Sequence, residues 1–290
     1  MRRSQRMVAL TTALAAATAP LLAIASPAVA EPAKTTAIHT TNQNLPLDWL
    51  SLDALSGTQL LQKVKQLLGK GYVPAALSVT NAANPQYSSV WVKDTTRKVN
   101  VLQGLSATNL QKTVAEQLKA GFRPAMITGT GTGANAVFAV VFEQVKGLAK
   151  SELSLTKETF TKVNAELTAA GYSLASLDVY GTVEKPLYAA VWIVGAATGT
   201  VQVTLGQTVE QRGQELLAKA KQGLHPVLMA VEPGKLYTTV WSKTGTAGKE
   251  YLSLSRLGYA AKATQMKVLG YRPAILDTEG GVFAAIWRKG

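Results

Sequence analysis

The phrases Gly270-Tyr271-Arg272-Pro273 and Phe283-Ala284-Ala285-Ile286-Trp287 decide the fold of this chain. The same pair of phrases occurs four more times upstream, first as Gly71 to Pro74 and Tyr87 to Trp91. Each second phrase begins with an aromatic residue and closes with Val or Ile followed by Trp or Phe. Self-similarity at a fixed period is typical of repeat proteins, whose units share one continuous core. The chain is therefore one structural unit written five times.

A hydroxyl residue lies 15 residues before the glycine of every unit: Ser56, Ser106, Thr156, Thr208 and Ser255. Serine and threonine cap helix N-termini because the hydroxyl accepts a hydrogen bond from a free backbone N–H of the first turn. Glycine is the usual residue just past a helix end, where the chain turns left-handed. The spacing predicts one helix of about 14 residues in each unit.

Hydrophobic pairs flank four of the five caps, as in a hydrophobic staple. The pairs are Leu55 with Leu60, Leu105 with Leu110, Leu155 with Phe160, and Leu254 with Tyr259. The fourth unit has Gln207 and Arg212 instead. Because both members are lost together, the pattern indicates a real contact in the other units.

Short alternating runs before each cap, and again after each glycine, predict strands around the helix. Each unit should be β-α-β-β, with a hairpin formed by its last two strands. We predict an α+β protein of five tandem repeats that closes into a ring or a propeller-like array. Open arrays need polar terminal caps, and neither end of the repeats carries one. An open superhelical array is the alternative.

The N-terminal segment has the pattern of a secretory signal peptide over 1–30. Arg2, Arg3 and Arg6 precede an apolar run, and Ala28-Val29-Ala30 is a cleavage motif, so we expect a secreted protein cut after Ala30. A polar lead-in over 31–47 is predicted to be disordered. One repeat domain should fill 48–290. Its approximate units are 48–94, 95–146, 147–197, 198–245 and 246–290.

Composition limits the classes of function. There is no cysteine, so an exported chain would have no disulfide framework. The net charge is +13, and removal of the three arginines of the leader leaves +10. Such a surface favours anionic partners, for example cell-wall polymers, acidic polysaccharide or lipid head groups. Lysines that only keep the helix faces soluble are the alternative. We expect no nucleic acid partner and no membrane span.

No catalytic residue, metal site or cofactor is assigned from the sequence. The two histidines, His39 and His225, are too few for a metal centre or a triad. His225 shares its place in the repeat with Val73, Arg123, Ser173 and Arg272, so we expect this position to face solvent. We expect no acidic residue to recur at equivalent strand positions, and no Ser-x-x-Lys nucleophile box anywhere in the chain. Lys243-Thr244-Gly245 matches another hydrolase box, but we read it as a turn.

The Gly-Tyr-x-Pro phrase, the Tyr-Ala-x-Val-Trp strand and the Leu-Ser/Thr cap together resemble the bacterial tandem repeat domain. The resemblance covers 49–287, with Phe142 in place of Trp and Leu174 in place of Pro as departures. The family occurs in secreted proteins and often precedes a β-lactamase-type serine hydrolase domain, as in the polyglycine hydrolases. The resemblance implies no catalytic role for the repeats themselves, and we expect this chain to lack that hydrolase domain.

Function in repeat proteins is expected where the units differ. The distance from the repeat glycine to the aromatic strand varies from 13 to 17 residues, whereas the distance from cap to glycine is constant. The hairpin tips are therefore the candidate binding face, whereas the recurring Tyr and Trp residues should pack in the core. The candidate ligand-binding residues at the tips are Asn81, Asn84, Asn135, Tyr180, Lys185 and Lys235.

The leading hypothesis is a secreted, non-catalytic repeat protein that binds an extracellular or cell-wall partner such as a glycan, an anionic polymer or a peptide. The first alternative is an accessory or remnant of a secreted serine hydrolase system, acting with a separately encoded catalytic chain. The second alternative is a hydrolase whose site is assembled at the centre of the ring.

Overall fold

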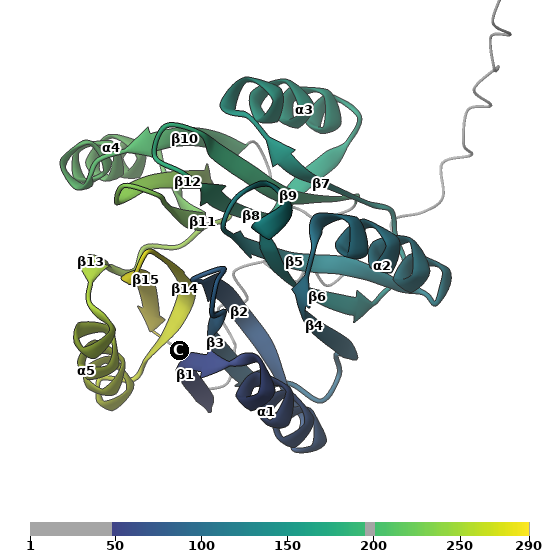
Figure 1. The fold of residues 1–290 in the computed structure, drawn as a ribbon. Helices are drawn as coiled ribbons and strands as arrows, with labels where there is room; N and C mark the ends of the chain where they lie inside the picture. Colours follow the sequence, from purple (N-terminus) through teal and green to yellow (C-terminus); the bar gives the residue numbers. More distant parts are fainter. Residues whose placement is uncertain (1–47, 195–200, 290) are drawn as a thin grey trace, which may run out of the picture. The chain divides into compact units, whose positions relative to one another are not determined.

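The computed structural model describes residues 48–194 and 201–289. The predicted signal peptide and lead-in lie outside the described residues. Five units follow one another along the chain, and each contains a strand, a helix and two further strands in that order (Figure 1). This order confirms the predicted β-α-β-β unit.

The first three units contain these elements in chain order: β1 (Trp49–Ser56), α1 (Gly57–Gly69), β2 (Tyr72–Thr80), β3 (Gln86–Lys93); β4 (Val99–Leu105), α2 (Ala107–Lys119), β5 (Phe122–Thr130), the short 3-10 helix η1 (Gly133–Asn135), β6 (Val137–Gln144); β7 (Ala149–Leu155), α3 (Lys157–Ala169), β8 (Tyr172–Gly181), β9 (Pro186–Val194). The last two units contain β10 (Val201–Gln207), α4 (Val209–Lys221), β11 (His225–Glu232), β12 (Leu236–Ser242); β13 (Lys249–Leu254), α5 (Arg256–Val268), β14 (Tyr271–Glu279), β15 (Val282–Lys289).

Each unit forms its own three-stranded antiparallel sheet, and the third strand of the unit lies in the middle. In the first unit the order is β1-β3-β2, and the other four units repeat it. The middle strand carries the aromatic phrase, so this phrase is hydrogen-bonded on both sides. The sequence pattern could not predict the strand order within a unit.

The five helices begin and end where the sequence predicts. All five cap residues accept a hydrogen bond from the backbone N–H three positions later, with distances of 3.1 to 3.3 Å. Every repeat glycine has a positive φ, from 70° to 83°. A side chain at these glycines would be strained, which explains why the phrase starts with glycine in each unit.

The aromatic strands pack beneath the helices, as expected. Four tryptophans of these strands have no exposed surface: Trp91, Trp192, Trp241 and Trp287. Phe160 of α3 stacks on Tyr188 with ring centroids 5.0 Å apart, and Tyr259 of α5 stacks in the same way on Phe283. Because successive side chains alternate across a strand, the intervening residues point to the opposite face of each sheet. We call this second face, which is turned away from the unit's own helix, the inner face.

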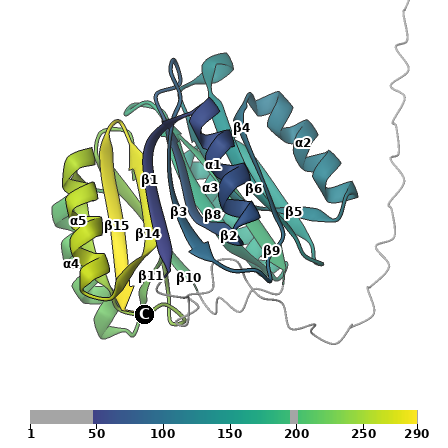
Figure 2. The same cartoon turned by 90° about the horizontal axis from the view of Figure 1, so that it is seen from below.

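The register of the strands gives every unit two ends. Ser56 and Thr80 both pair with Gln86, so the helix start and the hairpin turn lie together at one end, the hairpin end. Trp49 and Val73 both pair with Val92, so the helix end, the repeat glycine and the links between units lie at the other end, the glycine end. In Figure 2 the hairpin turn between β14 and β15 lies at the top, and the C-terminus lies at the bottom.

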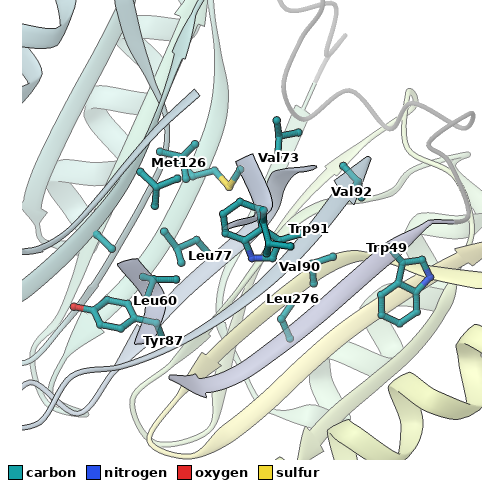
Figure 3. Packing of buried hydrophobic residues seen from close by; sticks show 14 of the residues in the cluster. Trp49, Leu60, Val73, Leu77, Tyr87, Val90, Trp91, Val92, Met126 and Leu276 are labelled. Atoms are coloured by element: carbon teal, nitrogen blue, oxygen red, sulfur yellow. The ribbon is translucent and has the colours of Figure 1, made fainter. Parts of the chain in front are cut away.

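Neighbouring units touch through their second strands. β2 contacts β5, β5 contacts β8, β8 contacts β11, and β11 contacts β14; β14 in turn contacts β2. The indole Nε1 of Trp49 in the first unit donates to the carbonyl of Tyr271 in the fifth at 3.2 Å. The largest hydrophobic cluster joins residues of the fifth, first and second units, including Leu276, Trp91 and Met126 (Figure 3). None of the units therefore has a core of its own.

The fourth unit has a buried cation where the other units have a staple residue. Leu60, Leu110, Phe160 and Tyr259 are at most 1% exposed, and Arg212 at the equivalent position is 0% exposed. The Arg212 guanidinium lies 4.2 Å from the ring centroid of Trp241. It also donates to Thr239 and pairs with Glu250 of the fifth unit at 2.5 Å. The cation thus replaces a hydrophobic contact by an ion pair that joins two units.

Removal of the Arg212 charge alone should be costly, because Glu250 would stay buried without its partner. We expect Arg212→Leu to lower the free energy of unfolding by about 3 to 5 kcal/mol, measured by urea denaturation. The double variant Arg212→Leu with Glu250→Leu should recover most of this loss, since well-packed apolar residues can replace a buried pair. A double variant as unstable as the single one would contradict this account of the pair.

Candidate functional site

Five equivalent positions on the inner face include four buried polar side chains. They lie seven residues after the repeat glycine: Ser78, Thr128, Asp178, Ala230 and Asp277. All five pair with a residue of the third strand that alternates with the aromatic positions, so they point away from the helices. All five are buried. Four are polar, in the middle of strands that are otherwise mainly apolar.

These side chains bind the backbone of the neighbouring second strand. The N–H of Val79 donates to Thr128 Oγ1 at 3.1 Å, and the N–H of Gly129 donates to Asp178 Oδ2 at 2.5 Å. The two other bonds of this kind join Val231 N–H to Asp277 Oδ2 at 2.7 Å and Thr278 N–H to Ser78 Oγ at 3.2 Å. In every case the acceptor is the equivalent residue of the adjacent unit. Only Ala230 lacks a side chain that can accept.

Three carboxyl groups near these bonds hold protons more strongly than usual. Burial raises the pKa of Asp178 to about 6, against hydrogen bonds from Gly129 and Thr128 that lower it. Burial, followed by the charge of Asp178, raises the pKa of Asp277 well above its usual value. The same two causes raise the pKa of Glu279 to about 8. Because the charge of Asp178 opposes the ionisation of Asp277 and of Glu279, the three groups do not all ionise together near neutral pH.

A cavity of about 60 Å³ lies between the five second strands. Its walls include Asp178 and Asp277 together with the apolar residues Met126, Leu228 and Ile275. The space admits water molecules, but a sugar ring or a peptide is larger. The carboxyl pair could exchange a proton with such water. Asp178 and Asp277 therefore form a polar centre that holds protons, and their carboxyl oxygens already accept hydrogen bonds from neighbouring units.

The glycine end of the inner face contains buried arginines. The position shared by Val73, Arg123, Ser173, His225 and Arg272 was expected to face solvent, and this expectation is wrong. Val73, Arg123 and Arg272 are at most 2% exposed, and Ser173 and His225 are half-buried. The second strand has a bulge just after the Pro position, which keeps the residue before it on the same inner face as the later residues. Burial, and then the charge of Arg272, lower the pKa of Arg288 to about 10.

The expected site residues at the hairpin tips are mostly exposed, but they do not form one site. Asn84, Asn135, Lys185 and Lys235 have exposed side chains in four different hairpins. Asn81 is exposed too, and its Oδ1 accepts from the backbone N–H of Asn84 at 3.3 Å. Asn81 has φ 60° and Lys235 has φ 63°, so both also shape their turns.

Tyr180 differs from the other tip residues because it lies inside β8 and is only 1% exposed. Its ring meets Phe138 edge-on at 5.2 Å, and its hydroxyl bonds to the Ser154 hydroxyl at 2.9 Å. Tyr237 bonds Ser253 with the same geometry. Alternation along β8 places Tyr180 on the inner face rather than at the exposed turn. Its side chain is therefore not available to an external ligand.

Neighbouring hairpin tips approach one another. A surface pocket of about 630 Å³ lies between the first and second tips, lined by Ala82, Ala83 and Asn135 together with the Ser106 cap. A Cβ atom added to Gly131 would lie 2.5 Å from the side chain of Ala82, so these tips are in contact. Val183 and Gly234 bring the third and fourth tips together in the same way. Asn135 is the predicted residue that lines a pocket.

The expectation that the chain contains no Ser-x-x-Lys is wrong, because Ser154-Leu155-Thr156-Lys157 matches this pattern. The structure gives its residues other roles. Ser154 has φ 57° at the bulge of β7, Thr156 caps α3, and Lys157 is exposed in the first turn. Ser253 is the equivalent of Ser154 and bonds to Tyr237 without a lysine three residues later. The Ser-x-x-Lys match therefore consists of residues that form the bulge of β7 and the start of α3 in the third unit.

The sequence also contained a signal for the central carboxyls that was missed. Asp178 and Asp277 occupy equivalent strand positions, and so do Glu232 and Glu279, which contradicts the expectation that no acidic residue recurs. Counting from the repeat glycine would have aligned them. Among the described residues, no three acidic or histidine side chains are grouped as metal ligands. No helix in this part of the chain has the length and apolar character to cross a membrane.

The raised pKa of Glu279 predicts a pH dependence of stability. Between about pH 4.5 and 8 the folded protein keeps a proton that the unfolded chain has lost, so stability falls as pH rises through this window. Glu279→Gln should remove the part of this fall that Glu279 causes and raise the free energy of unfolding at pH 8 by on the order of 2 kcal/mol. Urea midpoints at both ends of the window measure the effect. The exposed Glu184→Gln is the control, and equal profiles for both variants would contradict the assignment.

One family model matches most of the chain, and its description is polyglycine hydrolase-like, structural repeat. The matched residues are 47–94, 99–145, 150–193 and 245–290. Each match corresponds to one unit of the fold. The fourth unit lies outside the matched ranges, and it is also the unit with Arg212 in place of the staple and Ala230 in place of a polar residue. Its strands and helix nevertheless follow the order of the others. The chain belongs to the polyglycine hydrolase-like structural repeat family.

Proposed function

We propose that the five units close into a ring and that this ring is a non-catalytic recognition scaffold, which binds an extracellular or cell-wall partner at its hairpin end. Closure is the architectural part of the proposal. It is supported by three contacts between the last and first units: β14 with β2, Trp49 with Tyr271, and Ser78 with Thr278. Ser78 is 1% exposed, and its hydroxyl both donates to Thr278 O and accepts from Thr278 N–H.

If the ring is closed, Ser78 should contribute as much to the free energy of unfolding as an equivalent residue that joins two consecutive units. Ser78→Ala should lower the free energy of unfolding by about 1 to 3 kcal/mol, because the buried N–H of Thr278 loses its acceptor. Thr128→Val, which acts between the first and second units, should cost a similar amount. The exposed Thr132→Ala is the control. In an open array Ser78→Ala would have no more effect than this control in urea denaturation.

The functional part of the proposal rests on the exposed hairpin tips. The helix frame is constant in all five units, with a helix of 13 residues in each, while the tips differ in length and in side chains. Neighbouring tips are in contact, and the pocket of about 630 Å³ between the first two has the size of ordinary ligand sites. The export pattern of the sequence supports an extracellular partner. The pocket beside Asn135 is the single observation that carries this part.

Binding at the hairpin end can be tested on arrays of cell-wall glycans and peptides. We expect specific retention on such an array, and the pocket variant Asn135→Ala with Thr132→Ala should weaken it about tenfold. The exposed helix variant Thr264→Ala, which is far along α5 from the cap, is the matched control. Turnover of an array compound, or labelling of Ser154 by a serine-reactive fluorophosphonate, would contradict a non-catalytic role.

An accessory role beside a secreted serine hydrolase is the second candidate. It is favoured by the family match, whose description refers to polyglycine hydrolases. Here the hairpin end would contact a separately encoded catalytic chain. Co-purification from culture medium, lost in the pocket variant, would support this role. A hydrolase whose activity does not change when the protein is added would count against it.

A further inference from the structure

We infer that the glycine end is a docking surface for an anionic lipid membrane, separate from the recognition surface proposed at the hairpin end. The inference begins with the distribution of charge between the two ends. Four lysines are exposed where the helices end: Lys70, Lys119, Lys221 and Lys267. Six more are exposed in the links between units and at the last strand: Lys98, Lys146, Lys150, Lys243, Lys249 and Lys289.

Few acidic groups oppose these lysines. Asp48, Glu116 and Glu166 are exposed carboxylates near the glycine end of the described residues, exposed Glu152 lies further along β7, and Asp94 in the first link is half-buried. At the hairpin end, four exposed basic residues stand among three exposed acidic ones, so that end is nearly balanced. The excess positive charge of the described chain is therefore concentrated at one end. Charge concentrated in this way attracts anionic surfaces over distances of about one Debye length.

The glycine ends of different units lie on the same side. The inner-face hydrogen bonds join equivalent positions of neighbouring second strands, which holds these strands level with one another. Direct contacts confirm this alignment at the glycine end itself. Arg288 of the fifth unit donates to Pro226 O of the fourth, and Lys267 donates to Trp49 O of the first. The exposed lysines of several units can therefore act on one surface.

Exposed apolar side chains lie between the lysines. Leu148, which is 65% exposed, lies in the link Lys146-Gly147-Leu148-Ala149-Lys150. Val268, which is 84% exposed, and Leu269, which is 47% exposed, directly follow Lys267. Leu118 precedes Lys119 and is 42% exposed. These side chains stand in water beside cations, an arrangement typical of surfaces that insert into the boundary between lipid head groups and acyl chains.

The apolar residues decide between two anionic partners. A soluble polyanion gains its binding energy from the lysines and makes no use of Leu148 or Val268. A membrane uses both, because lysines attract anionic head groups and the apolar side chains leave water. The hairpin end also exposes Val183, Val209 and Leu257, but it lacks the excess of lysines. The combination of both features therefore favours a lipid surface at the glycine end.

The test is sedimentation of the protein with vesicles. We expect binding to vesicles of phosphatidylcholine mixed with phosphatidylglycerol, and little binding to phosphatidylcholine alone. Lys146→Gln with Lys150→Gln and Lys119→Gln should weaken binding about 100-fold. Leu148→Gln with Val268→Gln, which keeps all charges, should weaken it about tenfold. All these side chains are exposed, so circular dichroism should show unchanged folding.

The matched control changes the same kinds of residue at the hairpin end: Lys185→Gln with Lys235→Gln and Leu257→Gln. This control should bind vesicles like the unchanged protein. Equal loss in the control, or no binding to anionic vesicles, would overturn the inference. Retention on sodium polyphosphate that survives Leu148→Gln with Val268→Gln, without vesicle binding, would assign the lysines to a soluble polyanion instead. The outcome is independent of the array experiment, because none of the glycine-end variants touches the pocket at the hairpin end.

Discussion

Hydrogen bonds from backbone N–H groups to side chains of the next unit are the interaction on which the assembly depends. The five sheets share no strand, so no backbone ladder passes from one unit to another. Side chains at one repeated position, such as Thr128 and Asp178, supply the connection instead. Because each bond joins the same pair of positions, neighbouring units are held at the same height. The common alignment of the hairpin ends and of the glycine ends follows from this rule.

These hydrogen bonds between units place carboxyl groups in the buried interior. A carboxylate that accepts a buried N–H is favoured by that bond, but burial and its carboxyl neighbours oppose its charge. The balance between the hydrogen bonds that favour the charge and the burial that opposes it differs between units. Asp178 accepts from its own neighbour Val179 as well as from Gly129, and Ala230 stands where the fourth unit would supply an acceptor. The cavity between the five second strands has both Asp178 and Asp277 in its wall. Ala230, which cannot accept a hydrogen bond, thus belongs to the unit between those that supply Asp178 and Asp277.

Local chemistry allowed the unit to be predicted from the sequence, whereas long-range geometry did not. Ser56 and Gly71 mark a helix by their own backbone requirements, so the helix bounds followed directly. The face of the sheet to which Arg123 points depends on a bulge after Pro124, and the amino-acid sequence does not reveal this bulge. Tyr180 was placed at a turn because β8 extends further into the hairpin than the tip pattern suggested. The carboxyl positions could have been found by counting from the glycine, but their proximity required the contacts between units.

Helix chemistry alone does not explain the lysines of the glycine end. Cations near a helix C-terminus are favoured by the helix dipole, which accounts for Lys119, Lys221 and Lys267 without any partner. The dipole effect fades within the last turn, so it does not extend to Lys146, Lys150 or the other lysines in the links between units. Nor does it account for an exposed Val268 or Leu148, which contribute nothing to a helix terminus or to solubility. A surface that combines both features has a use only where charge and apolar area are buried together, and a lipid interface is such a place.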